Sequence, residues 1–263
     1  MNSPQSFYAG LTQYYHLIYP DWESSIRRQA SQLDSVIREC WGADIRSVLD
    51  ASCGIGTQAL GLAPLEYSVT GSDLSAESIA RARTEARQRN LEIDLKVCDM
   101  RQLSNHFTQK YDIVISCDNS VPHLLTDEDI LGAFREFWHC TRHGGGCLIT
   151  VRDYEKEDVS QQQVKPYGIR EVDGARWLVW QVWEPNEQNY DVTMYLVEDR
   201  GQSSCQTHVF RSTYYPIKIS RLMELLVEAG FDNVRRIDDR FYQPILIGTR
   251  NRRQSAATTA RRA

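Results

Sequence analysis

Short apolar segments typical of buried strands alternate with helical segments between residues 45 and 151. The predicted strands cover residues 45–50, 67–71, 93–97, 113–116 and 147–151. Predicted helices begin at Thr57, Ser75 and Asp127. This alternation predicts parallel β-α-β units, because a parallel strand is reached through a crossover that is usually a helix. We therefore expect an α/β fold with a doubly wound sheet, which binds ligands beyond the carboxyl ends of its strands.

The segments on either side of this alternation have other patterns. Residues 14–40 carry apolar positions at helical spacing, and residues 1–44 are predicted to form a helical segment that closes the site. Residues 154–215 predict an antiparallel β cap over the substrate, with strands at 176–183, 191–197 and 207–214. A helix over 220–229, with Ser220 as N-cap, and a last strand over 244–249 complete the core, which spans 45–153 and 216–249. The arginine-rich residues 250–263 predict a disordered basic tail.

Charge and composition exclude several classes of protein. The net charge is 30 − 35 = −5, and the five arginines of residues 250–263 leave about −10 on the rest, which argues against a nucleic-acid groove. No apolar run approaches the roughly 20 residues that span a bilayer, and no export signal is evident. We expect a cytoplasmic protein without a membrane segment.

The cysteines also fit a cytoplasmic protein. The seven cysteines include no C-x-x-C pair, as is usual for reduced thiols. His139, Cys140 and His143 lie close together but lack a second ligand pair at zinc-finger spacing. We expect no metal.

Small residues fill the turn between the first predicted strand and the helix that follows it. Ser52, Gly54 and Gly56 let a ligand approach the backbone. A dinucleotide fingerprint would need a glycine at Ala59, and Asp50 would then stand beside phosphates. An acid at this turn suits a cationic ligand better.

Acidic residues also follow the next two strands. Asp73, 23 residues after Asp50, is placed to accept hydrogen bonds from a ribose diol. Asp99 ends the third strand, where it could accept from an adenine amine while Met100 packs on the ring. The alternative is that Asp50 and Asp73 only cap helices.

These segments resemble those of the class I S-adenosylmethionine-dependent methyltransferases. Asp50–Gly56 resembles their motif I, Ser72-Asp73 their ribose acid, Cys98–Met100 their adenine segment, and Arg142–Gly146 the turn before their fifth strand. The resemblance implies a Rossmann-like seven-stranded sheet, S-adenosylmethionine as methyl donor and no metal. The donor-binding residues that it implies are Tyr19, Arg28, Asp50, Ser52, Cys53, Gly54, Gly56, Asp73, Leu74, Asp99, Met100 and Cys117. Ser52 replaces a glycine found in most members.

Four further segments resemble the glycine N-methyltransferases and related glycine/sarcosine enzymes. They are Cys117–Leu124, Val151–Tyr154, Phe210–Pro216 and Tyr242–Pro244. In that comparison Asn119 contacts donor and substrate, and Arg152 grips the carboxylate of an amino acid. The family's N-terminal tyrosines correspond to Tyr8 and Tyr19, and its arginine for the donor carboxylate corresponds to Arg28.

Further reasoning from the residues concerns the catalytic candidates. Arg152 follows the fifth strand, where a guanidinium can clamp a carboxylate with two hydrogen bonds; a surface ion pair is the alternative. Tyr214 and Tyr215 face opposite sides of a strand, and we expect Tyr215 in the site. His123 is either catalytic or an ordinary loop histidine. Asp118 stands where the glycine enzymes have glycine, and it could bind a substrate ammonium, take a proton or only fill space.

The sequence therefore predicts a methyltransferase acting on a small molecule, most simply the amine of glycine, sarcosine or a related small amino acid. The alternative acceptor is an aromatic natural product methylated on oxygen or carbon, in a pocket that includes Trp177–Trp183. A donor-binding protein without catalysis is a third hypothesis. We expect a monomer or a homodimer with a carboxylate-bearing small-molecule substrate.

Overall fold

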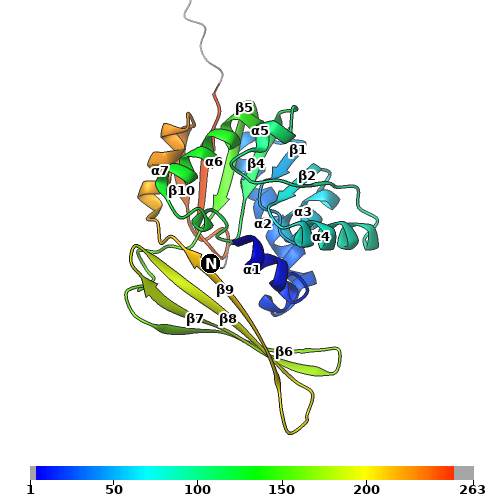
Figure 1. The fold of residues 1–263 in the computed structure, drawn as a ribbon. Helices are drawn as coiled ribbons and strands as arrows, with labels where there is room; N and C mark the ends of the chain where they lie inside the picture. Colours follow the sequence, from blue (N-terminus) through cyan, green and yellow to red (C-terminus); the bar gives the residue numbers. More distant parts are fainter. Residues whose placement is uncertain (1–3, 252–263) are drawn as a thin grey trace, which may run out of the picture.

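The computed structural model describes residues 4–251, and it has two parts that meet along one side (Figure 1). The first part is a seven-stranded sheet between helices. Its strands are β1 (Ser47–Asp50), β2 (Ser68–Asp73), β3 (Asp94–Val97), β4 (Tyr111–Ser116), β5 (Thr141–Thr150), β10 (Asp232–Ile237) and β11 (Ile245–Thr249). Their order is β10-β11-β5-β4-β1-β2-β3, with β11 antiparallel to both neighbours. The predicted α/β fold with a doubly wound sheet is confirmed.

The strand order reverses between β1 and β4. From β1 the chain continues outward to β2 and β3, and then returns to β4 and β5 on the other side. The helices that follow β1 and β4 therefore leave toward opposite faces, which opens a crevice at the carboxyl ends of these strands. The topology places a ligand site there.

Helices cover both faces of the sheet (Figure 1). The helices are α1 (Pro4–Leu11), α2 (Trp22–Trp41), α3 (Thr57–Leu62), α4 (Ala76–Gln88), α5 (Leu103–His106), α6 (Asp127–Cys140) and α7 (Ile219–Glu228). Three 3-10 turns are η1 (Tyr15–Ile18), η2 (Ala63–Leu65) and η3 (Val121–His123). Leu33 and Ile37 of α2 pack with Ile113 on one face, while Phe134 of α6 and Leu222 of α7 belong to the cluster on the other. Burial of these apolar side chains holds the three layers together.

Side-chain caps begin α2 and α4. Asp21 accepts a hydrogen bond from the Ser24 amide at the start of α2, and Ser75 accepts one from the Ser78 amide at the start of α4. The prediction that Ser220 caps α7 is wrong. The helix already begins at Ile219, after Lys218, and Ser220 lies in its first turn.

The second part is an antiparallel sheet that projects from the core (Figure 1). Its strands are β6 (Gln163–Val172), β7 (Ala175–Asn186), β8 (Asn189–Asp199) and β9 (Gln206–Tyr214), in the order β6-β7-β8-β9. Its inner face buries Trp177 and Met194 against Phe7 of α1 and Leu17 of η1. The sheet and the N-terminal segment therefore form one apolar cluster beside the crevice.

Strands β6 and β10 were not predicted. Strand β6 contains Pro166 and Gly168, where its register with β7 shifts, and the charged β10 pairs only with β11 at the edge of its sheet. Such strands lack the clear apolar alternation on which sequence reasoning depends.

One prediction about the end of the chain needs correction. Arg250, assigned to a disordered tail, lies over the Trp138 ring at 3.6 Å and donates hydrogen bonds to the Trp138 and Thr141 carbonyls (2.8 and 2.6 Å). The remainder of that predicted tail, residues 252–263, lies outside the described residues. Within residues 4–251, no helix combines the length and the apolar character that a membrane crossing needs.

The triple glycine was expected to be a turn before the fifth strand, but it lies within β5. A Cβ on Gly145 would collide with the Asp112 carbonyl oxygen, and one on Gly146 would collide with the Trp41 ring and with the Gly248 carbonyl oxygen at 2.5 Å. Glycine is thus required here because neighbouring strands and α2 approach the backbone closely.

We expect Gly145→Ala to lower the free energy of unfolding by about 1–3 kcal/mol, because the added methyl group has to displace backbone. Chemical denaturation measures this. Gly132→Ala is the matched control: it lies in α6 with nothing within 4 Å of the added Cβ, and should raise the free energy by about 0.5–1 kcal/mol through helix propensity. Equal effects of the two variants would contradict this account of β5.

Candidate active site

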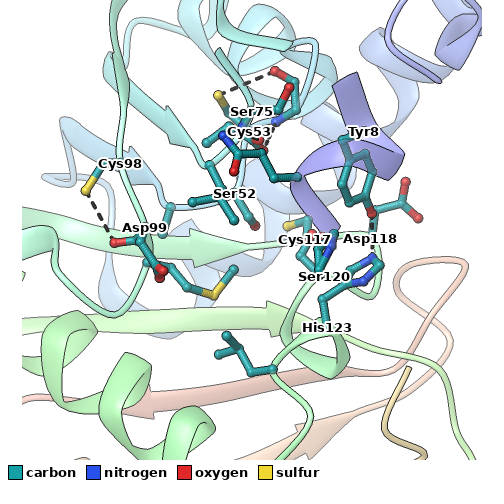
Figure 2. A pocket seen from close by; sticks show the side chains of 18 of the residues that line it. Tyr8, Ser52, Cys53, Ser75, Cys98, Asp99, Cys117, Asp118, Ser120 and His123 are labelled. Carbon is teal, nitrogen blue, oxygen red and sulfur yellow. Dashed lines mark hydrogen bonds between the residues drawn. The ribbon is translucent and has the colours of Figure 1, made fainter. Parts of the chain in front are cut away.

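A cavity of about 380 Å³ lies at the carboxyl ends of β1 to β4, beneath α1 (Figure 2). Its wall includes most of the residues predicted from the sequence. These are Tyr19, Ser52, Cys53, Gly54, Asp73, Leu74, Asp99, Met100, Cys117, Asp118 and His123. Segments far apart in the chain therefore converge on one cavity, which we call the donor cavity.

The turn after β1 has the backbone shape that the sequence suggested. Gly54 has a φ of +54° and Gly56 one of +100°, so both adopt conformations that favour glycine. A Cβ on Gly54 would meet no atom within 4 Å, so the backbone there faces open space. Asp73 accepts hydrogen bonds from the Gly54 and Ser75 amides, both at 2.9 Å, and so joins this turn to the end of β2.

Asp50 does not reach the wall of the donor cavity. Its side chain is fully buried at the end of β1; one oxygen accepts a long hydrogen bond from the Ser52 amide (3.4 Å) and the other has no partner. Burial raises the pKa of Asp50 to about 7. A cation nearby would favour the ionised form of such a group, and a sulfonium or ammonium group in the cavity is a cation of that kind. Gly56 also lies outside the wall, as the N-cap of α3.

Arg28 is not brought to the cavity. It is an exposed residue of α2, whose buried face carries Ile26, Gln29 and Ala30 instead. Helical geometry turns Arg28 away from the core, and Arg28 does not line the donor cavity where its contact with the donor carboxylate was predicted. The basic residue in the wall of the donor cavity is Arg101.

Asp99 lies in the wall as predicted, but Arg101 already engages it. The Arg101 guanidinium contacts both carboxylate oxygens, at 2.6 Å to Oδ2 and 3.1 Å to Oδ1, and it also reaches Asp129 at 2.8 Å. Burial opposes ionisation of Asp99, but the Arg101 hydrogen bonds prevail and lower its pKa. Asp99 is therefore ionised, and Arg101 already occupies some of its hydrogen-bond acceptor sites.

A second, smaller cavity of about 40 Å³ adjoins the first, and we call it the acceptor cavity. Tyr8, Tyr15 and Asp118 line both cavities, so these residues mark their junction. The other residues around it are Phe7, Leu11, Ile18, Asn119, Arg152, Tyr167, Gln181, Met194 and Tyr214. Helix α1, the loop after β4, the end of β5 and the inner face of the antiparallel sheet thus enclose it.

Arg152 contributes a positive charge to this enclosure. Its guanidinium donates to the hydroxyls of Tyr167 (3.2 Å) and Tyr190 (3.5 Å) and lies over the Trp183 ring at 4.9 Å. Within residues 4–251 it forms no ion pair with a carboxylate. The surface ion pair considered as an alternative is therefore not present in the described chain, and the charge faces a cavity.

Asn119 fixes the loop that follows β4. Its φ is +63°, and its side-chain oxygen accepts a hydrogen bond from the Arg152 amide at 3.0 Å. Its amide nitrogen donates to the Tyr154 hydroxyl at 2.8 Å. Asn119 is thus a positioning residue that ties the loop to the segment carrying Arg152.

His123 has two hydrogen-bond partners. Nε2 is bonded to the Tyr8 hydroxyl (2.8 Å; Figure 2) and Nδ1 to the Ser212 hydroxyl (3.2 Å). Burial, together with the positive charge of Arg152, lowers the pKa of His123 to about 3. The ring is therefore neutral at ordinary pH, and it orients Tyr8 rather than carrying a proton to or from a substrate.

The structure places Tyr214, and not the predicted Tyr215, at the acceptor cavity. Tyr214 is buried, lines the acceptor cavity and lies with its ring centroid 4.0 Å from that of His123. Tyr215 points away and donates to Asp127 at 3.1 Å. Strand alternation predicts that one of the two faces inward, but it does not say which until the register of β9 with β8 is known.

Sequence reasoning missed several residues of the acceptor cavity. Tyr15, Tyr167, Gln181 and Met194 line it, and no motif marks them. The tyrosines of residues 14–19 (YYHLIY) are the one signal available, because phenols at that density in a predicted helical segment are unusual for a simple apolar face.

Comparisons with known proteins agree with this geometry. A family model described as a methyltransferase domain matches residues 48–145. A glycine/sarcosine N-methyltransferase from Aphanothece halophytica is 24% identical over 224 residues, covering 83% of this chain and 79% of the relative. This chain is an S-adenosylmethionine-dependent methyltransferase.

Solved structures share its fold. Streptomyces venezuelae DesVI has a TM-score of 0.77 at 17% identity, over 91% of this chain and 96% of that one. CalS10, an amino pentose methyltransferase from Micromonospora echinaspora solved with S-adenosylmethionine bound, has a TM-score of 0.75 at 16% identity, over 86% and 92%. These likenesses agree with the predicted α/β fold. Residues 4–251 contain no group of three or more His, Cys, Asp or Glu side chains arranged to hold a metal.

The methyltransferase should depend on Asp73 for its donor. Asp73→Ala removes a carboxylate from the donor cavity and the acceptor of the Gly54 amide, so we expect S-adenosylmethionine to bind about 10- to 100-fold more weakly. Calorimetric titration measures this. Asp94→Ala, an exposed acid at the start of β3, is the control and should bind the donor normally. A change of less than threefold for Asp73→Ala would contradict the assignment.

His123 should make the enzyme sensitive to acid. The unfolded chain takes up a proton on this residue below its ordinary pKa of 6.5, whereas the folded protein does so only near 3, so lowering the pH favours unfolding. Between pH 6.5 and 5, we expect the wild type to lose about 2 kcal/mol more stability than His123→Asn. Denaturation at several pH values measures the difference. The same pH dependence in both proteins would show that His123 titrates normally when folded.

Proposed function

We propose that the enzyme methylates the amine of a small, carboxylate-bearing molecule of the glycine or sarcosine type. The observation that carries this proposal is the unpaired guanidinium of Arg152 beside the acceptor cavity. Removing a charge from water is costly unless an opposite charge or hydrogen bonds replace the solvent, and two phenols do this only in part. A substrate carboxylate is the partner that completes the site.

The size of the acceptor cavity supports the same class of substrate. About 40 Å³, enclosed by tyrosines, suits a molecule of a few non-hydrogen atoms rather than a ring system. The glycine/sarcosine N-methyltransferase relative is named for such substrates. The alternative, an aromatic acceptor, rested on tryptophans that would line the pocket. No tryptophan of residues 4–251 lines either cavity.

The side chains of the site suit a reaction in which the amine and the methyl group are held in line. S-adenosylmethionine supplies an electrophilic methyl group. Arg152 orients the acceptor from the opposite side of the junction. Burial raises the pKa of the Cys53 and Cys117 thiols well above the usual range, so both stay protonated and are poor nucleophiles beside the donor. Holding the amine and the methyl group in line is then the main source of rate.

Transfer of a labelled methyl group to glycine, sarcosine, dimethylglycine and larger amino acids, with products identified by mass, tests the substrate. We expect methylated product from the smallest members. Arg152→Gln should raise the KM of that acceptor about 30- to 150-fold, because a charge-assisted hydrogen bond is lost, with the donor KM changed less than threefold.

Arg211→Gln, which removes an exposed arginine of β9, is the control for the loss of one positive charge and should behave as wild type. Equal losses for donor and acceptor in Arg152→Gln would contradict the role of Arg152. No product from any amino acid would contradict the substrate class.

A further inference from the structure

At the junction of the two cavities, Asp118 occupies a position with left-handed backbone. Its φ is +58°, a conformation that an L-residue adopts at some cost and that glycine adopts freely. A carboxylate retained at such a position needs surroundings that hold it there. Those surroundings come from two segments that are far apart in the chain.

Three tyrosine hydroxyls donate to the Asp118 carboxylate. Tyr15 (3.1 Å) and Tyr19 (2.9 Å) both reach Oδ2, and Tyr242, from the loop between β10 and β11, reaches Oδ1 at 2.7 Å. Burial, followed by the charge of Asp118, raises the pKa of the Tyr15 and Tyr19 phenols, so they remain donors. Tyr242 is half exposed. A carboxylate has about four acceptor sites, so one remains on Oδ1.

Asp118 and Arg152 line the same small cavity without touching each other. Within the described residues neither forms an ion pair, although their charges are opposite. The cavity therefore carries a negative group on its donor side and a positive group on the other. A molecule with a cationic amine and an anionic carboxylate matches this arrangement of charges.

We propose that Asp118 is the specificity residue that binds the acceptor as an ammonium ion, so that the site selects zwitterionic amino acids over carboxylates that lack a charged amine. This inference rests on the proposed function, which assigns the carboxylate to Arg152. It adds a binding partner for the amine of the acceptor, and it places the reacting nitrogen at the junction with the donor cavity. The ammonium must lose one proton before its nitrogen can attack the methyl group, and solvent accepts that proton.

Two matched ligand pairs test this inference by equilibrium binding. Glycine and propionate differ in one group, ammonium against methyl, and sarcosine and butyrate differ likewise. Calorimetric titration into the protein loaded with S-adenosylhomocysteine measures binding without turnover. We expect the wild type to prefer each zwitterion by at least about tenfold. Asp118→Asn should reduce the preference to less than threefold while leaving propionate binding nearly unchanged.

Asp118→Gly is the second variant, because glycine accepts the positive φ and removes the charge without strain; it should lose the preference in the same way. Asp191→Asn is the control, since Asp191 also accepts from a hydroxyl (Thr213, 2.6 Å) but lines neither cavity, and it should keep the preference.

Equal wild-type affinities within each pair, or a preference that survives in both Asp118 variants, would overturn the role of Asp118 while leaving that of Arg152. Failure of the wild type to bind any of the four ligands would overturn the proposed function, and this inference with it.

Discussion

Much of the site depends on two consecutive left-handed residues at the end of β4. Asp118 and Asn119 both have positive φ, which costs of order 1–3 kcal/mol for each residue. Contacts to β5 offset that cost: the Asp118 amide donates to Thr150 Oγ1 (2.8 Å), and the Asn119 amide donates to the Thr150 carbonyl (3.1 Å). This turn directs Asp118 to the junction of the cavities and, through Asn119, fixes the backbone of Arg152.

The rest of the chain supplies the enclosure that this turn requires. Helix α1 and η1 bring Tyr8 and Tyr15, the antiparallel sheet brings Tyr167 and Tyr214, and the β10–β11 loop brings Tyr242. None of these elements belongs to the first five strands of the α/β sheet. The sheet therefore forms the donor cavity, while other parts of the molecule enclose the acceptor cavity, a common division between fold and function.

Sequence reasoning predicted the donor side of the site better than the acceptor side. The residues around Gly54 and Asp73 follow strands directly, so the period of the sheet is enough to bring them together. Arg28 and Tyr215 do not line the cavities for which they were predicted. Each lies one position from an inward-facing neighbour, and the rotation of α2 and the register of β9 are set by packing. Tyr167 and Gln181 belong to strands whose position over the core is a tertiary feature that no local pattern encodes.

The central claim is that the acceptor's carboxylate binds Arg152 while its amine lies at the Asp118 junction. A crystal structure of the enzyme with S-adenosylhomocysteine and sarcosine tests it most directly. We predict carboxylate oxygens about 2.7–3.0 Å from the Arg152 guanidinium, and the amine nitrogen on the side of Asp118 that faces the donor. Sarcosine bound in the reverse orientation, or outside the acceptor cavity, would contradict the account.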